Sequence, residues 1–153
     1  MRLVVFTLVI AALAGCGGSN ETSNSEPLRA GAYEYELTKQ YLLDNGIGEY
    51  QAEAESGAHE ATLGPDGSFV DAWKPVDGLA NSCRGTYEEN DGNRVTFKWT
   101  YGCFGDWQMT YSVDGDVVTW SDQEAMPPYD DDEERKVVEV FNSVPWTRVG
   151  DAS

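Results

Sequence analysis

The feature that most constrains the fold is a series of closely spaced turns within residues 83–122, each flanked by alternating apolar and polar residues. Asp114-Gly115 is typical of a two-residue β-hairpin turn, because aspartate and glycine tolerate the positive φ values that such turns need. This turn predicts that Tyr111 pairs with Val118. Strand alternation then places an apolar set on one face, which we expect to be the core: Trp107, Met109, Tyr111, Val113, Val118 and Trp120.

A second hairpin is predicted just upstream. Asn90-Asp91-Gly92 fits a three-residue loop closed by a left-handed glycine, and it pairs Tyr87 with Val95. A two-residue turn would mix charged and apolar side chains on one face, so we prefer the three-residue loop. The apolar face of this hairpin then holds Cys83, Gly85, Tyr87, Val95, Phe97 and Trp99.

A third hairpin surrounds Pro65-Asp66-Gly67, which again fits a type I turn followed by a left-handed glycine. It predicts the pairs Leu63 with Phe69, Ala61 with Asp71 and His59 with Trp73. His59 and Asp71 therefore fall on the apolar face, where buried polar groups need partners. We expect these two side chains to interact, either as a structural pair or as ligand contacts.

The remaining elements are shorter. We expect a strand over residues 33–37, a helix over 39–45 capped by Thr38, and a last strand over 146–149. Residues 51–56 are ambiguous between helix and loop. A helix over 133–143, capped by Asp132, carries one apolar stripe: Val137, Val140, Phe141 and Val144.

These elements predict a mainly β fold. About eight short strands, one short early helix and one C-terminal helix are typical of an antiparallel barrel. A two-sheet sandwich is the alternative. We expect the final strand to close the barrel by pairing with the first.

The first residues resemble the signal peptide of bacterial lipoproteins. A basic residue precedes an apolar run over residues 3–14, and Leu13-Ala14-Gly15-Cys16 is similar to the lipobox, whose cysteine is lipidated. The resemblance implies cleavage before Cys16 and an acylated terminus, which anchors the protein to the extracytoplasmic face of a bacterial cell membrane. An ordinary secretory signal peptide is the alternative.

The chain accordingly divides into three parts: a signal peptide over residues 1–15, the lipidated cysteine and a polar tether over 16–28, and a folded domain over 29–150. The tether contains many Gly, Ser and Asn residues and so favours a flexible chain. About 120 residues remain, which is enough for one sizeable core.

The charge of the chain restricts its partners. Its net charge is −17, and removing Arg2 with the signal peptide makes it more negative by one. Such a surface repels nucleic-acid phosphates and anionic headgroups, so we expect no nucleic-acid partner. A cationic protein partner is compatible with this charge, and so is solubility alone.

The three cysteines separate into two roles. If Cys16 carries the lipid, Cys83 and Cys103 remain in an oxidising compartment and within the predicted core, so we expect a disulfide between them. This bond would stabilise the fold by about 3 kcal/mol. A metal site would need further ligands, and the sequence contains only one histidine, His59.

The sequence contains no motif typical of an enzyme. His59-Glu60 begins like a zinc-protease motif, but the second histidine is missing. The acidic run over residues 130–134 lacks the spacing and the glycine of a calcium loop. We therefore expect no catalytic residue, no metal and no cofactor.

A set of short segments gives a second resemblance. In chain order they are Gly31-Ala32-Tyr33-Glu34-Tyr35, Asn45-Gly46-Ile47, Gly85-Thr86-Tyr87, Gly92-Asn93-Arg94-Val95-Thr96-Phe97, Val113-Asp114-Gly115-Asp116-Val117-Val118-Thr119-Trp120 and Pro145-Trp146-Thr147-Arg148-Val149. This order resembles the lipocalin-like (calycin-type) domains of bacterial lipoproteins, and similar segments end some actinobacterial solute-binding lipoproteins of peptide transporters. Where true lipocalins have Gly-x-Trp this chain has a tyrosine, so packing on Arg148 would have to use Tyr33.

The resemblance implies ligand binding inside the barrel. We expect a small apolar or aromatic ligand and a pocket lined by Tyr87, Trp99, Trp107, Tyr111 and His59. An eight-stranded barrel can also be filled by its own side chains. In that case we expect an envelope structural or protein-interaction domain that works through its acidic surface.

Overall fold

The computed structural model describes residues 26–75, 78–103, 105–126 and 132–152. The predicted signal peptide, Cys16 and most of the tether lie outside these residues. So do part of the acidic run and the side chains of residues 132–134 and 137, so the cap at Asp132 stays a prediction.

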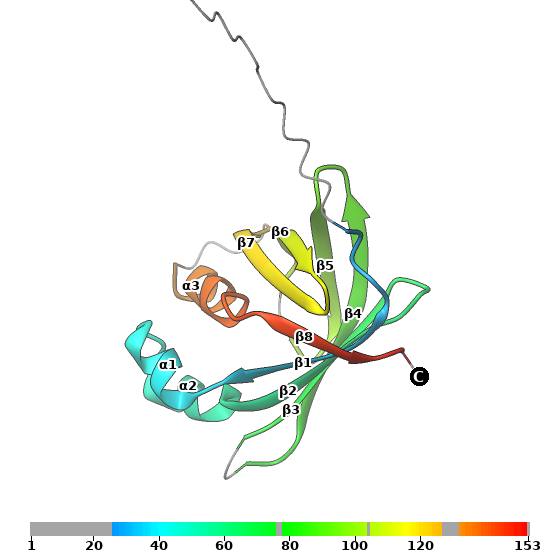
Figure 1. Ribbon diagram of the computed structural model, residues 1–153. Helices are drawn as coiled ribbons and strands as arrows, with labels where there is room; N and C mark the ends of the chain where they lie inside the picture. Colours follow the sequence, from blue (N-terminus) through cyan, green and yellow to red (C-terminus); the bar gives the residue numbers. More distant parts are fainter. Residues whose placement is uncertain (1–25, 76–77, 104, 127–131, 153) are drawn as a thin grey trace, which may run out of the picture.

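Eight antiparallel strands form a closed barrel in which each strand pairs with the next and the last pairs with the first (Figure 1). The strands are β1 (Gly31–Leu37), β2 (Gly57–Leu63), β3 (Ser68–Lys74), β4 (Asn81–Asn90), β5 (Arg94–Tyr101), β6 (Trp107–Asp114), β7 (Val117–Ala125) and β8 (Trp146–Gly150). The architecture confirms the predicted lipocalin-like barrel and its closure, and the sandwich alternative is wrong.

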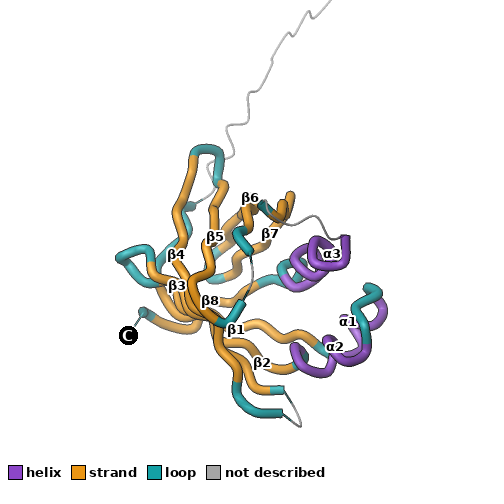
Figure 2. The backbone as a smooth tube through the Cα atoms, turned by 180° about the vertical axis from the view of Figure 1, so that it is seen from behind, coloured by secondary structure: helices purple, strands orange, loops and turns teal. Residues whose placement is uncertain are grey.

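Three helices gather at one end of the barrel, as Figures 1 and 2 show from opposite sides. They are α1 (Lys39–Asp44), α2 (Glu49–Glu55) and α3 (Asp132–Phe141). Thr38 caps α1 as predicted, since its side chain accepts a hydrogen bond from the Tyr41 amide. The segment that was ambiguous in the sequence is the helix α2. None of the described helices has the length and apolar character needed to cross a membrane.

The hairpin between β2 and β3 has the predicted register. Leu63 pairs with Phe69, and His59 pairs with Trp73. Gly67 adopts a φ of 80°, as the turn requires.

The hairpin between β4 and β5 is shifted from its predicted register. Its loop has three residues, but they are Asp91-Gly92-Asn93, and Tyr87 pairs with Phe97 instead of Val95. Gly92 and Asn93 both adopt positive φ values, 77° and 57°, which glycine and asparagine tolerate better than most residues do. Moving the loop by one residue along both strands keeps the predicted faces, so the core assignment still holds.

The hairpin between β6 and β7 is shifted in the same way. The two turn residues are Gly115 and Asp116, and Tyr111 pairs with Trp120 instead of Val118. This arrangement places the positive φ, 63°, on the glycine at the first central position of the turn. The predicted apolar face is confirmed, because the shift again preserves the alternation.

The barrel interior has two layers. At the end formed by the tight hairpin turns, hereafter the turn end, it is filled by a continuous apolar cluster. The buried members of this cluster are Leu28, Tyr33, Ala61, Leu63, Phe69, Val95, Phe97, Met109, Tyr111, Val118, Trp120 and Trp146. Leu28, which the sequence assigned to the tether, therefore belongs to the core.

The opposite end, hereafter the helix end, is covered by a second cluster. Leu37 at the end of β1 packs with Leu42 of α1, Ala52 of α2 and Val140 of α3. Val140 confirms part of the predicted stripe, and the hydroxyl of Tyr41 donates to its carbonyl oxygen at 3.4 Å. The three helices therefore act as a lid over this end of the barrel.

The predicted disulfide geometry is confirmed. Cys83 lies on β4 with no exposed surface, and its Cα atom is 5.2 Å from that of Cys103. The two sulfurs are within bonding distance. The bond ties the connection between β5 and β6 to the barrel wall.

Candidate ligand-binding site

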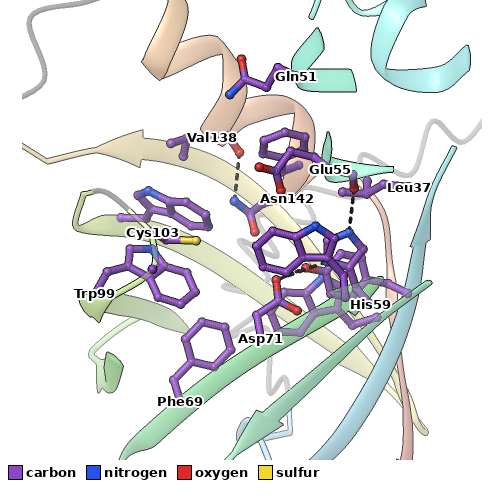
Figure 3. Close-up of a pocket in the computed structure, with 16 residues that line it drawn as sticks. Leu37, Gln51, Glu55, His59, Phe69, Asp71, Trp99, Cys103, Val138 and Asn142 are labelled. Carbon is purple, nitrogen blue, oxygen red and sulfur yellow. Dashed lines mark hydrogen bonds and ion pairs between the residues drawn. The ribbon is translucent and has the colours of Figure 1, made fainter. Parts of the chain in front are cut away.

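A cavity of about 270 Å³ lies at the helix end, between the barrel interior and the helices (Figure 3). Its strand residues are Tyr35, Leu37, His59, Phe69, Asp71, Trp73, Trp99, Trp107 and Trp146. Gln51 and Glu55 of α2 line it as well, together with Val138 and Phe141 of α3 and the following Asn142. In Figure 3, Phe69 and Asp71 project from β3 into the cavity, while the helical residues lie across from them.

The structure brings together three of the five ligand contacts predicted from the sequence. Trp99, Trp107 and His59 line the cavity. Tyr87 and Tyr111 point into the barrel near its turn end instead. The hydroxyl of Tyr87 donates to the carbonyl of Gly64, and that of Tyr111 donates to a carboxylate oxygen of Glu89.

His59 and Asp71 face inward and interact, as predicted. Nδ1 of His59 is 3.3 Å from Oδ2 of Asp71, and the same oxygen accepts a hydrogen bond from the Tyr35 hydroxyl at 2.8 Å. Nε2 of His59 is 2.9 Å from the carbonyl oxygen of Glu55. Because both ring nitrogens face acceptor oxygens, the ring donates both hydrogen bonds when it is an imidazolium.

The same contacts hold α2 against the barrel. The indole nitrogen of Trp73 donates to the carbonyl of Ala54 at 3.0 Å, next to the carbonyl that meets His59. These carbonyls belong to the last turn of α2, whose free oxygens would otherwise lack partners. The docking places the side chain of Glu55 at the cavity.

Two titratable groups of the site are perturbed. Burial raises the pKa of Glu55 to about 7; nearby His59 opposes this rise and Asp71 adds to it. Burial, followed by the adjacent Asp71 carboxylate, also raises the pKa of Tyr35 well above its usual value. A carboxyl group with a pKa near 7 can act as an acid, a base or a counter-ion.

The aromatic wall is dense. Trp99 and Trp107 meet edge to face with ring centroids 5.4 Å apart, and Tyr35 stacks between His59 and Trp146 at 4.6 and 5.0 Å. Several buried polar atoms of the lining have no hydrogen-bond partner within the described part of the chain: Asp71 Oδ1 and the indole nitrogens of Trp99, Trp107 and Trp146. Buried polar atoms of this kind suit a ligand that supplies both a donor and an acceptor.

Several residues of this cavity were not among the five predicted lining residues, although Asp71 was expected as the partner of His59. The strand pairing placed Asp71 and Trp73 on the inner face, which was a sufficient signal for both. Glu55 and Asn142 had no such signal, because acidic residues are numerous and the covering helices had no predicted position over the barrel. Among the described residues, no three His, Cys, Asp or Glu side chains are grouped closely enough to hold a metal ion.

No family model matches this chain, and no curated protein or solved structure matches it either.

Proposed function

We propose that this protein is a lipid-anchored binding module that holds a small molecule with an aromatic or apolar part in the helix-end cavity. The observation that carries the proposal is the cavity itself, a space of about 270 Å³ with aromatic walls and with buried polar atoms that no described residue pairs. Apolar walls with a few polar groups are typical of small-molecule sites. For comparison, an apolar protein cavity of about 150 Å³ accommodates a benzene molecule.

Binding fits the lining better than catalysis does. The described lining residues include no serine, threonine or lysine, and Cys103 is paired with Cys83. Both ring nitrogens of His59 contact oxygens of the fold, those of Asp71 and Glu55, so this residue serves as part of the cavity wall. We therefore propose a non-catalytic role.

The lipoprotein resemblance supports a location in a bacterial envelope. The start of the folded domain lies at the turn end, where the Leu28 amide donates to the Tyr111 hydroxyl and Arg29 pairs with Asp116. The cavity lies at the other end of the barrel. A lipid at Cys16 would therefore be joined through the tether to the turn end, at the opposite end of the barrel from the cavity.

Replacing Cys16 by serine should release the protein from membranes or leave the precursor unprocessed, because the lipid would have no attachment point. Membrane fractionation and the mass of the mature N-terminus report this result. Wild-type protein that lacks an acyl mass, together with unchanged fractionation of the variant, would refute the anchoring.

The cavity is tested by a small aromatic probe such as 2-phenylethanol. Four of the five tryptophans line the cavity, so binding should change the intrinsic fluorescence. Trp107→Ala should weaken binding by about tenfold because it removes a wall of the site. Tyr101→Ala is the control, since this side chain is 70% exposed and lies outside the lining.

Equal losses in both variants would place the probe elsewhere. If the wild-type protein shows no saturable fluorescence response to any probe, cavity binding is refuted. The function would then lie on the acidic outer surface, which would bind a protein partner.

A further inference from the structure

We propose that the ligand is an amine: its cationic ammonium group lies between Glu55 and the free oxygen of Asp71, and its apolar part lies among the tryptophan rings. This inference rests on the proposed binding function and specifies its ligand class. Three features of the cavity carry it.

The first feature is an unused acceptor. Asp71 is buried, and its Oδ2 already accepts from Tyr35 and meets His59. Its Oδ1 is also buried but has no hydrogen-bond partner in the described chain. A buried carboxylate oxygen favours a charged donor, because charge-assisted hydrogen bonds are about twice as strong as neutral ones.

The second feature is the charge of the lining. Glu55 and Asp71 supply two carboxyl groups, and His59 can balance one of them. The described lining residues include no lysine and no arginine, so the second carboxylate has no cation of its own. One ammonium group would complete this balance, whereas an anionic ligand would add a third negative charge.

The third feature is the aromatic wall. Trp99, Trp107 and Trp146 all line the cavity, and a cation close to an indole face is attracted by the ring quadrupole. The net charge of −17 acts in the same direction, since it raises the local concentration of small cations around the protein.

The state of Glu55 makes the preference depend on pH. The groups that face this side chain are His59 from β2, Asp71 from β3 and Tyr35 from β1, while the described lining residues of α3 include no titratable group. Burial raises the pKa of Glu55 to about 7, so its carboxyl group is mostly protonated below that value. An ammonium group binds the ionised form better, so amine affinity should increase as the pH rises through 7, and binding below 7 should release a proton.

The experiment compares three probes that share one ring and differ in charge: 2-phenylethylamine, 2-phenylethanol and phenylacetate. Calorimetric titration of the mature chain, with Cys16→Ser to avoid detergent, gives the three affinities. At about pH 8 we expect the amine to bind about tenfold more tightly than the alcohol, with phenylacetate weakest. At about pH 5.5 the preference for the amine should become small because Glu55 is protonated.

Two variants test the assigned partner. Glu55→Gln should abolish most of the preference for the amine and its pH dependence, while the affinity for the alcohol changes little. Glu49→Gln is the matched control, because this residue lies on the same helix with its side chain 80% exposed. The control should retain both the preference and its pH dependence.

The outcomes separate the two proposals. If the amine and the alcohol bind equally at both pH values, the amine inference is overturned while the binding function stands. The inference also fails if Glu55→Gln keeps the full preference for the amine. If none of the three probes binds the wild-type protein, the proposed binding function is itself refuted.

Discussion

Replacing Trp146 by alanine should lower the free energy of unfolding by about 3–5 kcal/mol, the range found when large buried aromatic residues are truncated. Trp146 is only 2% exposed and is the first residue of β8. Its ring contacts several others: Tyr33, Tyr35, Phe69, Phe97 and Trp120. These rings come from β1, β3, β5 and β7, so one side chain joins the two halves of the barrel.

Denaturant unfolding of the mature chain measures this loss. Val149→Ala is the control on the same strand, since Val149 is 53% exposed and should change stability by no more than about 0.5 kcal/mol. A loss below about 1 kcal/mol for Trp146→Ala would show that the neighbouring rings repack without it. The free energy of unfolding of Trp146→Phe should lie between those of the wild type and of Trp146→Ala.

Removing the disulfide should have the second-largest effect, about 3 kcal/mol of unfolding free energy. The double variant Cys83→Ala, Cys103→Ala leaves no unpaired thiol behind. Its probe affinity should fall too, because the bond holds the connection between Trp99 and Trp107, and both residues line the cavity. Stability is measured by denaturant unfolding with and without a reductant.

The reductant supplies the control for this prediction. It should destabilise the wild-type chain to the level of the double variant and leave the variant unchanged. Peptide mapping without reductant should recover Cys83 and Cys103 as one linked pair. Two free thiols in protein from its own compartment would contradict the assignment.

Strand faces were predictable because they depend only on alternation along the chain. Met109, Val118 and Trp120 are buried as expected, although two hairpins differ from their predicted registers. Each difference moves a loop by one residue along both strands, which preserves the inward set. The exact loop depends on which residues adopt positive φ, and neighbouring Asp, Gly and Asn residues offer alternatives of similar energy.

Irregularities in the ladder were not predictable. Asp122 adopts a φ of 49°, and the register of β6 against β7 shifts between Gln108 and Thr110. A further shift lies between Arg84 and Gly85 of β4. Bulges of this kind follow from the curvature of a closed barrel, a property of all eight strands together.

The two ends of the barrel differ in whether side chains fill the interior. The sequence supplied aromatic residues for the whole interior, and both outcomes were compatible with their volume. In the structure the turn end holds the buried apolar cluster, and the cavity lies at the helix end. Tyr87 and Tyr111 are therefore part of a filled layer, while Trp99 and Trp107 line the space above it.

The sequence by itself determined the strands, their inward faces, the cap of α1, the inward pair of His59 and Asp71 and the partner of Cys83, because each depends on local pattern or on a small set of candidates. Tertiary structure alone decided where the cavity lies and which carboxylate reaches it. Glu55 is one acidic residue among 27. Its side chain reaches the cavity because His59 and Trp73 bind the backbone carbonyls at the end of α2. Burial, which raises its pKa, depends on the docking of α2 against the barrel, and no local pattern encodes that environment.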